Sequence, residues 1–312
     1  MSNLALSMRP EKLGDVLGNE SAKKAIASFA AKDNWPNVFL FYGPPGTGKT
    51  TFAEIVAKMI AGEDGDIRQI NGSVQNKVED ARELSEIAQS CSFNGRQRVF
   101  VVNEFHRWTL PAQDAVKDTL EKCPAVWLIT TDEPDKISAA ILSRAKPATF
   151  QLKPLGRSDL RDLVGRVLTS AKMSGKLSEV ADFLEKHFIY SPREILGVLD
   201  QYLAGVPLDQ CVHGSEHEPL YPEIASAVLS GNWTKTSNLL KQVQTADYRA
   251  MVAVVSAKMS WALLDSDFGP RADAIATCLV GLGVNQFADG VAYSSLKALL
   301  YKCTRTLTKE IK

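Results

Sequence analysis

Short apolar runs alternate with helical periodicities along the first half of the chain. The segments that we predict as strands cover residues 38–42, 67–71, 98–104, 125–131 and 148–152. Apolar residues at helical spacing separate them over residues 51–60, 78–88, 111–122 and 139–144, and an amphipathic helix begins near Ser21. Strands that alternate with helices and end in polar residues predict a doubly wound parallel α/β sheet, with a ligand at the carboxyl ends of its strands.

The second half of the chain has a helical pattern throughout. Apolar faces recur in three helical segments between Ser158 and Leu199, and residues 213–219 are polar and contain helix breakers. We expect the helices beyond this polar stretch to begin near Tyr221, Thr234, Tyr248, Arg271 and Gln286. The pattern predicts an α/β domain (1–153), a small helical lid domain (154–212), a linker (213–219) and an all-α C-terminal domain (220–312).

A glycine-rich loop joins the first predicted strand to the helix that follows it. The loop matches G-x-x-x-x-G-K-[ST] at every position, in the strand–loop–helix context that this motif requires. Its glycines let successive backbone N–H groups curl round a phosphate, and the helix directs its positive end at the same anion. The lysine adds charge near the β- and γ-phosphates, and the threonine offers a hydroxyl to Mg²⁺. We therefore expect a nucleoside triphosphate with Mg²⁺ at Gly43, Pro44, Pro45, Gly46, Thr47, Gly48, Lys49, Thr50 and Thr51.

The amino-acid composition indicates the class of protein that carries this site and limits its partners. Of the 312 residues, 45% are apolar and 23% are charged, as is typical of soluble globular proteins. No apolar run is long enough to span a membrane and the N-terminus lacks the apolar core of a signal peptide, so we expect a cytoplasmic protein with no membrane contact. The 36 basic and 36 acidic residues balance, so any nucleic-acid contact must be local. The five cysteines lie far apart, which favours reduced core thiols over zinc ligands or disulfides.

Four further side chains extend the predicted site. Glu104 ends the third strand, where a carboxylate can orient and partly deprotonate an attacking water. Thr131 ends the fourth strand and could hold that water, or the γ-phosphate, from the other side. Arg144 offers a guanidinium one element later, and Arg193 offers a second one on the small helical domain.

Together these motifs resemble those of the AAA+ ATPases, and within them the clamp-loader subunits. Arg9-Pro10 followed by Val16-Leu17-Gly18 is similar to that family's adenine-contacting segment. Thr130-Thr131 ahead of Asp132 is similar to the bacterial loader's sensor 1, and Leu142-Ser143-Arg144 is similar to the family's arginine-finger motif.

Two longer runs resemble the large clamp-loader subunit of tailed bacteriophages. One is Ser92-Phe93-Asn94-Gly95-Arg96-Gln97, followed by a strand, Asn103-Glu104-Phe105 and Arg107; the other is Ser191-Pro192-Arg193 leading to Leu199-Asp200. The resemblance covers residues 8–205, and beyond residue 220 it rests on helical content and length alone.

The resemblance implies a role for each matching residue. Lys49 and Thr50 would hold phosphate and Mg²⁺, Glu104 would activate water, and Thr131 would be sensor 1. Arg193 would be sensor 2, and Arg144 would act in trans on the ATP of a neighbouring subunit. A surface arginine that ends a helix is the alternative for Arg144.

The resemblance also implies contacts around the glutamate. Asn71 would restrain Glu104 until DNA arrives, and plain polarity at the end of a strand is its alternative. Arg107 would be a basic residue that senses DNA. Lys77 and Arg82 would contact DNA, although a solvated helix face explains these two equally well.

The chain departs from the family pattern at two positions. Asn103 stands where the family has an aspartate that positions Mg²⁺, and an amide keeps an acceptor oxygen but loses the charge. Because the loss of such an outer-shell group costs about 10–100-fold in affinity or activity, we expect a slower or more Mg²⁺-demanding ATPase, with an inactive one as the alternative. Ala145 replaces a cysteine without evident chemical consequence, and the absence of a cysteine-rich zinc insert favours a phage-type or eukaryotic-type loader.

The resemblance thus implies an ATPase subunit of a DNA polymerase sliding-clamp loader, of the phage type and acting in the cytoplasm, which for a phage-encoded protein is that of the host cell. Its expected partners are the sliding clamp, primer-template DNA, further copies of this chain with a smaller loader subunit, and indirectly a DNA polymerase. The C-terminal helices would form the oligomerising collar. The alternatives are another AAA+ DNA-processing ATPase, such as a branch-migration motor or a replication initiator, and a scaffold subunit that binds ATP without hydrolysing it.

Overall fold

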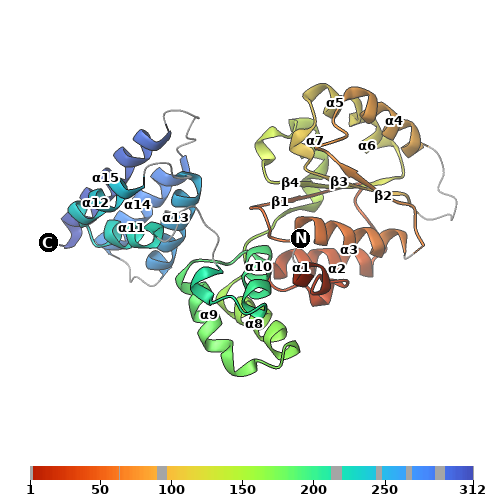
Figure 1. Ribbon diagram of the computed structural model, residues 1–312. Helices are drawn as coiled ribbons and strands as arrows, with labels where there is room; N and C mark the ends of the chain where they lie inside the picture. The colour runs from red at the N-terminus through yellow and green to blue at the C-terminus, as the bar shows by residue number, and fades with distance from the viewer. Residues whose placement is uncertain are drawn as a thin grey trace. The chain divides into compact units, whose positions relative to one another are not determined.

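The computed structural model describes residues 3–62, 64–89, 97–211, 220–243, 248–264, 269–284 and 292–311 (Figure 1). The predicted linker 213–219, Cys91, the run 92–96 and the helix start at Gln286 lie outside the described residues. The chain forms two compact units, each described here by itself: residues 1–182 with 189–206, and residues 183–188 with 207–312. The domain boundaries predicted from the sequence remain predictions.

A five-stranded parallel sheet forms the centre of the first unit. Its strands are β1 (Val38–Tyr42), β2 (Ile67–Asn71), β3 (Val99–Asn103), β4 (Val126–Thr131) and β5 (Thr149–Gln151), in the spatial order β2-β3-β4-β1-β5. β1 therefore lies between β4 and β5 although it comes first in the chain. The carboxyl ends of β1, β4 and β3 stand side by side, which is where ligands bind in sheets of this kind.

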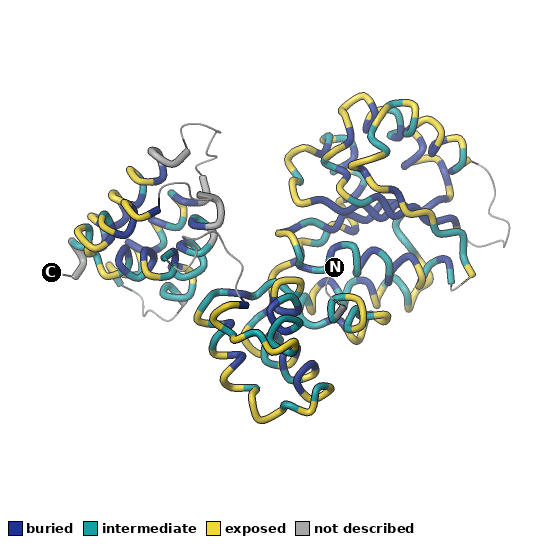
Figure 2. The backbone as a smooth tube through the Cα atoms, viewed as in Figure 1, coloured by how far each residue is buried: buried dark blue, intermediate teal, exposed yellow. Residues whose placement is uncertain are grey.

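Both faces of the sheet are covered by helices, as the near-continuous burial of β1, β3 and β4 requires (Figures 1 and 2). The helices α2 (Glu20–Ala31) and α3 (Lys49–Ala61) cover one face, and successive strand residues alternate between this face and the other. The opposite face is covered by α4 (Val78–Gln89), α5 (Leu110–Ala115), α6 (Lys117–Lys122) and α7 (Ala139–Ala145). The doubly wound sheet predicted from the sequence is confirmed.

Two glycines shape the turn from β1 into α3. Gly46 has a φ of 76° and Gly48 a φ of 91°, values in the left-handed region that L-residues with a side chain rarely adopt. Gly48 is the N-cap of α3, so the backbone turns directly from the loop into the first helical residue, Lys49. The loop and the positive end of α3 therefore lie at the carboxyl edge of the sheet.

Two local predictions differ from the structure. The helix predicted over residues 111–122 is two helices, α5 and α6, because the N–H of Val116 bonds Asp114 O and interrupts the regular hydrogen-bond pattern. The third strand ends at Asn103, and Glu104 lies beyond it in the left-handed region with a φ of 53°.

The helices that follow the sheet along the chain are α8 (Arg157–Ser170), α9 (Leu177–Lys186) and α10 (Pro192–Leu203). Ser191 is the N-cap of α10 and Pro192 its first residue, a favourable helix start because proline has no N–H to leave unpaired. The short helix α1 (Asn3–Ser7) packs against α10. The first unit includes α8 and α10, whereas α9 is divided between the two units after Asp182.

The second unit is a helical bundle with its own apolar core. It contains α11 (Leu220–Leu229), α12 (Trp233–Gln242), α13 (Tyr248–Leu264), α14 (Pro270–Val284) and α15 (Ala292–Ile311). Lys258 on α13 lies over the ring of Phe188 and donates to Pro222 O at 3.0 Å, and burial lowers its pKa. Within the described ranges, no helix has the length and apolar character needed to cross a membrane.

Candidate nucleotide site

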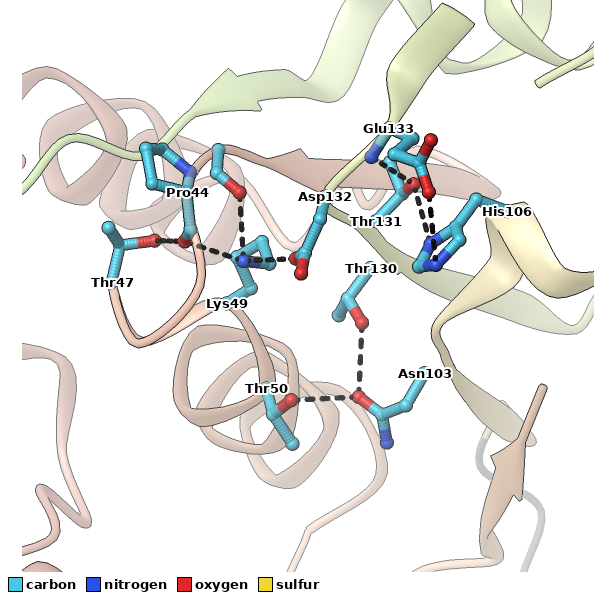
Figure 3. A network of polar contacts seen from close by, with 11 residues as sticks. Pro44, Thr47, Lys49, Thr50, Asn103, His106, Thr130, Thr131, Asp132 and Glu133 are labelled. Carbon is cyan, nitrogen blue, oxygen red and sulfur yellow. Dashed lines mark hydrogen bonds and ion pairs between the residues drawn. The ribbon is translucent and has the colours of Figure 1, made fainter. Parts of the chain in front are cut away.

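The ammonium of Lys49 lies inside the glycine loop (Figure 3). Its Nζ donates to Gly43 O at 2.9 Å and to Pro44 O at 2.8 Å, and it lies 2.6 Å from Asp132 Oδ1 at the end of β4. Thr47 Oγ1 also donates to Pro44 O, at 2.9 Å, and fixes the loop from the other side. The predicted phosphate lysine is therefore held at the carboxyl edge of the sheet by loop carbonyls and one carboxylate.

A second network joins α3 to β3 and β4. Asn103 Oδ1 accepts two hydrogen bonds, from Thr50 Oγ1 at 2.9 Å and from Thr130 Oγ1 at 3.1 Å (Figure 3). Mg²⁺ prefers oxygen ligands and keeps several waters, so the Thr50 hydroxyl and the Asn103 carbonyl fit a magnesium site beside the loop. The asparagine supplies an oxygen there without the negative charge of an aspartate.

Glu104 is held by the turn that follows β2. Ser73 Oγ donates to Glu104 Oε2 at 2.5 Å, and Arg107 Nε lies 3.7 Å from the same oxygen. Asn71 Oδ1 accepts from the N–H of Ser73 at 2.9 Å, and Gly72 N donates to Asn103 O at 2.8 Å. Among the described residues, Ser73 rather than Asn71 is thus the direct hydrogen-bond partner of this carboxylate, and Asn71 orders the turn that presents Ser73.

The two threonines at the end of β4 lie on opposite faces of the sheet. Thr130 continues the face of Leu128, which packs with α3, whereas Thr131 continues the face of Ile129, which packs with α4–α7. Thr131 Oγ1 lies 3.2 Å from His106 Nδ1 and accepts from Glu133 N at 3.0 Å.

The predicted sensor hydroxyl of Thr131 therefore contacts His106 and the loop after β4, not the Thr50–Asn103 pair. That loop is ordered further by Lys136, whose hydrogen bond to Glu133 lowers the pKa of the Glu133 carboxyl. Of the residues on either side, Thr130 donates to Asn103, and Asp132 pairs with Lys49 at the end of the glycine loop.

The start of α10 approaches the glycine loop. A Cβ placed on Gly46 would lie 3.1 Å from Arg193 Cβ and would collide with Ser191 Oγ, so only glycine fits at this contact. Ser191 Oγ is buried and has no hydrogen-bond partner among the described residues. The structure thus brings the predicted sensor 2, Arg193, to the loop that carries Lys49.

The predicted adenine-contacting segment packs between α3 and α8. Arg9 donates to Thr51 Oγ1 at 3.3 Å and lies 2.8 Å from Glu54 Oε2. Val16 is buried in the same apolar core as α2 and α3. Gly18 has a φ of 70° and a Cβ there would lie 3.4 Å from Asp159 Oδ2 on α8. Pro10 and Leu17 lie in the same segment and are partly buried.

The remaining predicted residues lie on the surface. Arg144 donates to Ala140 O at 3.0 Å and lies 2.5 Å from Glu121 Oε2, and neither partner belongs to the glycine loop. Lys77 and Arg82 are exposed at the start of α4, and the side chain of Arg107 is 61% exposed.

Sequence reasoning missed three residues of this site: Ser73, Thr130 and Asp132. Thr130 and Asp132 could have been found from the sequence. Side chains alternate along a strand, so these two residues lie on the sheet face covered by α3 and Thr131 lies on the opposite face. The sequence held no comparable signal for Ser73, whose contact depends on the left-handed backbone of Glu104.

Comparisons with known proteins relate the part of the chain that carries this site to a known family. Residues 39–151 match the family described as "ATPase family associated with various cellular activities (AAA)". The DNA polymerase III subunit gamma/tau of Mycoplasma pneumoniae is 29% identical over 220 residues, which cover 62% of this chain and 31% of that protein. The replication-associated recombination protein A of Escherichia coli K12 is 33% identical over 173 residues, 54% of this chain and 36% of that protein. The chain thus spans about a third of the length of these two relatives.

The fold is shared with a solved structure, the RuvB Holliday junction branch migration motor of Thermotoga maritima. The TM-score is 0.53 at 18% identity, over 79% of this chain and 84% of that chain. Residues 39–151 thus match the AAA ATPase family and lie in a chain with homology to the DNA polymerase III gamma/tau subunits.

Proposed function

We propose that this chain is an ATPase subunit of a DNA polymerase sliding-clamp loader. The observation that carries the proposal is the gathering of Lys49, Thr50, Asn103 and Glu104 at the carboxyl edge of the sheet, in a chain homologous to DNA polymerase III gamma/tau over 220 residues. The phage-type assignment rests on the runs 92–107 and 191–200, and residues 92–96 of the first run lie outside the described part.

Phosphoryl transfer to water depends on positioning the water and the phosphates and on stabilising the negative charge of the transferred group. Each side chain of the proposed site contributes to one or both of these. Lys49 and the loop amides bind the phosphates, while Thr50 and Asn103 hold Mg²⁺, which neutralises phosphate charge when it is bound. Glu104 orients the attacking water and accepts its proton, and the Ser73 hydroxyl, which donates to Oε2, competes with that water for one of the two carboxylate oxygens.

The sensing residues take roles that follow their positions. Because Thr130 shares the acceptor Asn103 Oδ1 with Thr50, we assign it the phosphate contact from β4, while Thr131 orders the loop after β4 through His106 and Glu133. Arg193 reports the nucleotide to the lid through the contact of α10 with the glycine loop. Arg144 reaches the ATP of a neighbouring subunit.

The proposed partners follow from this role. Several copies of the chain assemble with a smaller loader subunit through the C-terminal helices, in the cytoplasm, and ATP binding opens a sliding clamp. Primer-template DNA then contacts Lys77, Arg82 and Arg107, and since Arg107 lies beside Glu104, DNA that attracts this guanidinium changes the surroundings of the catalytic carboxylate. Release of the loaded clamp to a DNA polymerase ends the cycle.

Steady-state ATP hydrolysis tests the proposal. The purified chain is titrated with primer-template DNA, the smaller subunit and the clamp, and Glu104→Gln serves as the inactive control. Stimulation that requires both DNA and clamp is expected. Hydrolysis that responds to DNA but is indifferent to the clamp would contradict the loader role.

A second candidate function is a clamp-independent AAA+ DNA-processing ATPase. The specific observation in its favour is the 33% identity to replication-associated recombination protein A. A third, a scaffold that binds ATP without turnover, has only the neutral Asn103 in its favour. The same titration separates them, because the second predicts turnover without clamp and the third predicts none.

A further inference from the structure

The hydrogen-bonding capacity of Lys49 is fully used by the protein itself. An ammonium group has three N–H donors and no acceptor. The three acceptors around Nζ are Gly43 O, Pro44 O and Asp132 Oδ1, at 2.9, 2.8 and 2.6 Å. A phosphate oxygen can therefore bond Lys49 only by replacing one of these acceptors.

The three acceptors differ in charge and in freedom to move. The two carbonyls belong to the loop that must also enclose the phosphate, so they stay close to Nζ whatever is bound. Asp132 lies on a different element, directly after β4, and its side chain is 38% exposed against 9% for Lys49. The carboxylate can therefore turn into solvent, whereas the lysine cannot leave the loop.

Of the three acceptors around Nζ, Asp132 is the one that repels a phosphate most strongly. It carries a negative charge at hydrogen-bond distance from the cation that a triphosphate needs, and two anions so close repel each other. A charge-assisted pair of this kind is stronger than a hydrogen bond between neutral groups, so displacing it lowers the affinity for any anion that takes its place.

We infer that Asp132 is an internal competitor for the phosphate position on Lys49, and that it sets the affinity of this chain for nucleoside di- and triphosphates. The inference rests on the proposed nucleotide site and deepens it. By occupying Lys49 whenever the phosphates leave, the carboxylate favours release of bound nucleotide.

Nucleotide affinity measured on the full chain tests this inference. The variant Asp132→Asn keeps the shape of the side chain and removes its charge, and Asp135→Asn makes the same change at an exposed aspartate three residues further along the chain. Calorimetric titration with ADP and with a non-hydrolysable ATP analogue should show about fivefold tighter binding to Asp132→Asn and no change for Asp135→Asn.

A double-mutant cycle identifies the route of the effect. In a Lys49→Ala background, Asp132→Asn should gain much less affinity, because the carboxylate no longer competes for a cation. Equal or weaker nucleotide binding by Asp132→Asn would overturn the inference and make Asp132 a supporting residue. Failure of the unmodified chain to bind nucleotide would instead count against the proposed function, so the two failures are distinguishable.

Discussion

At the scale of single residues, Asn103 decides how much negative charge the proposed Mg²⁺ site carries. Its Oδ1 accepts from both Thr50 and Thr130, so the position that hydrogen bonding requires is kept. An amide oxygen is neutral, however, and attracts a hydrated divalent cation less strongly than a carboxylate does. The expected weakness of this site therefore lies in Mg²⁺ binding and not in the local structure.

Asn103→Asp should restore that charge. We expect the Mg²⁺ concentration needed for half-maximal ATP hydrolysis to fall by about 10–100-fold, the usual effect of an outer-shell metal partner. The measurement is hydrolysis at fixed ATP over a Mg²⁺ titration, with Asn71→Asp as a matched control at the end of the neighbouring strand. An unchanged Mg²⁺ requirement would mean that Asn103 is not a metal-positioning residue.

Ser73→Ala should raise basal hydrolysis in the absence of DNA. The hydroxyl donates to Glu104 Oε2 at 2.5 Å, and a carboxylate held in this way has one oxygen fewer for the attacking water. Because a hydrogen bond to a charged group contributes about 1.5–3 kcal/mol, we expect a rise on the order of tenfold. Ser73→Thr keeps the hydroxyl and should behave as the unmodified chain; a lower rate for Ser73→Ala would instead make Ser73 a residue that positions Glu104 productively.

At the scale of elements, the sequence predicted those helices, strands and loops that are determined by residues close together in the chain. The strand–loop–helix unit from Val38 to Ile60 could be predicted because an apolar run, a glycine motif and helical spacing all agree there. The break at Val116 could not, since no glycine or proline marks it. The contact of Asp132 with Lys49 could not be predicted either. It depends on β4 lying next to β1, although the two residues are 83 positions apart in the sequence.

The end of α9 gives a prediction on pH and stability. The ring of His187 packs against that of Phe183, tilted by 38° with centroids 4.4 Å apart, and burial lowers the pKa of its imidazole below the ordinary value of 6.5. The unfolded chain therefore takes up a proton at a higher pH than the folded chain. It follows that the free energy of unfolding falls as the pH falls from 6.5 through the folded-state pKa, and is unaffected by this group above that range.

Urea denaturation measures this effect. The loss of stability between about pH 7.5 and about pH 5 should be smaller in His187→Gln than in the unmodified chain, because glutamine does not titrate. Carboxylates titrate in both proteins and cancel in the comparison. Identical losses in the two proteins would show that protonation of His187 is not linked to unfolding.

At the scale of the whole molecule, Arg144 tests whether the proposed site is completed by a second copy of the chain. In the described structure its guanidinium contacts Ala140 and Glu121 on its own chain, away from the glycine loop. A finger that acts in trans has to leave both Ala140 O and Glu121, whose side chain is 60% exposed. An ion pair with one partner this exposed contributes little to stability, so the exchange of Glu121 for a phosphate costs little free energy.

Complementation between two inactive subunits tests whether Arg144 acts on the ATP of a neighbouring subunit. Arg144→Ala should lower hydrolysis by the assembled complex by about 10³–10⁵-fold, the effect of arginine fingers where it is known, while leaving ATP binding intact. Glu104→Gln should be inactive for a different reason, since its own site lacks the base but its arginine is present. Mixing the two variants pairs the intact site of the first with the intact arginine of the second, so hydrolysis should return in part. An arginine that acted on its own chain would give no recovery at any mixing ratio.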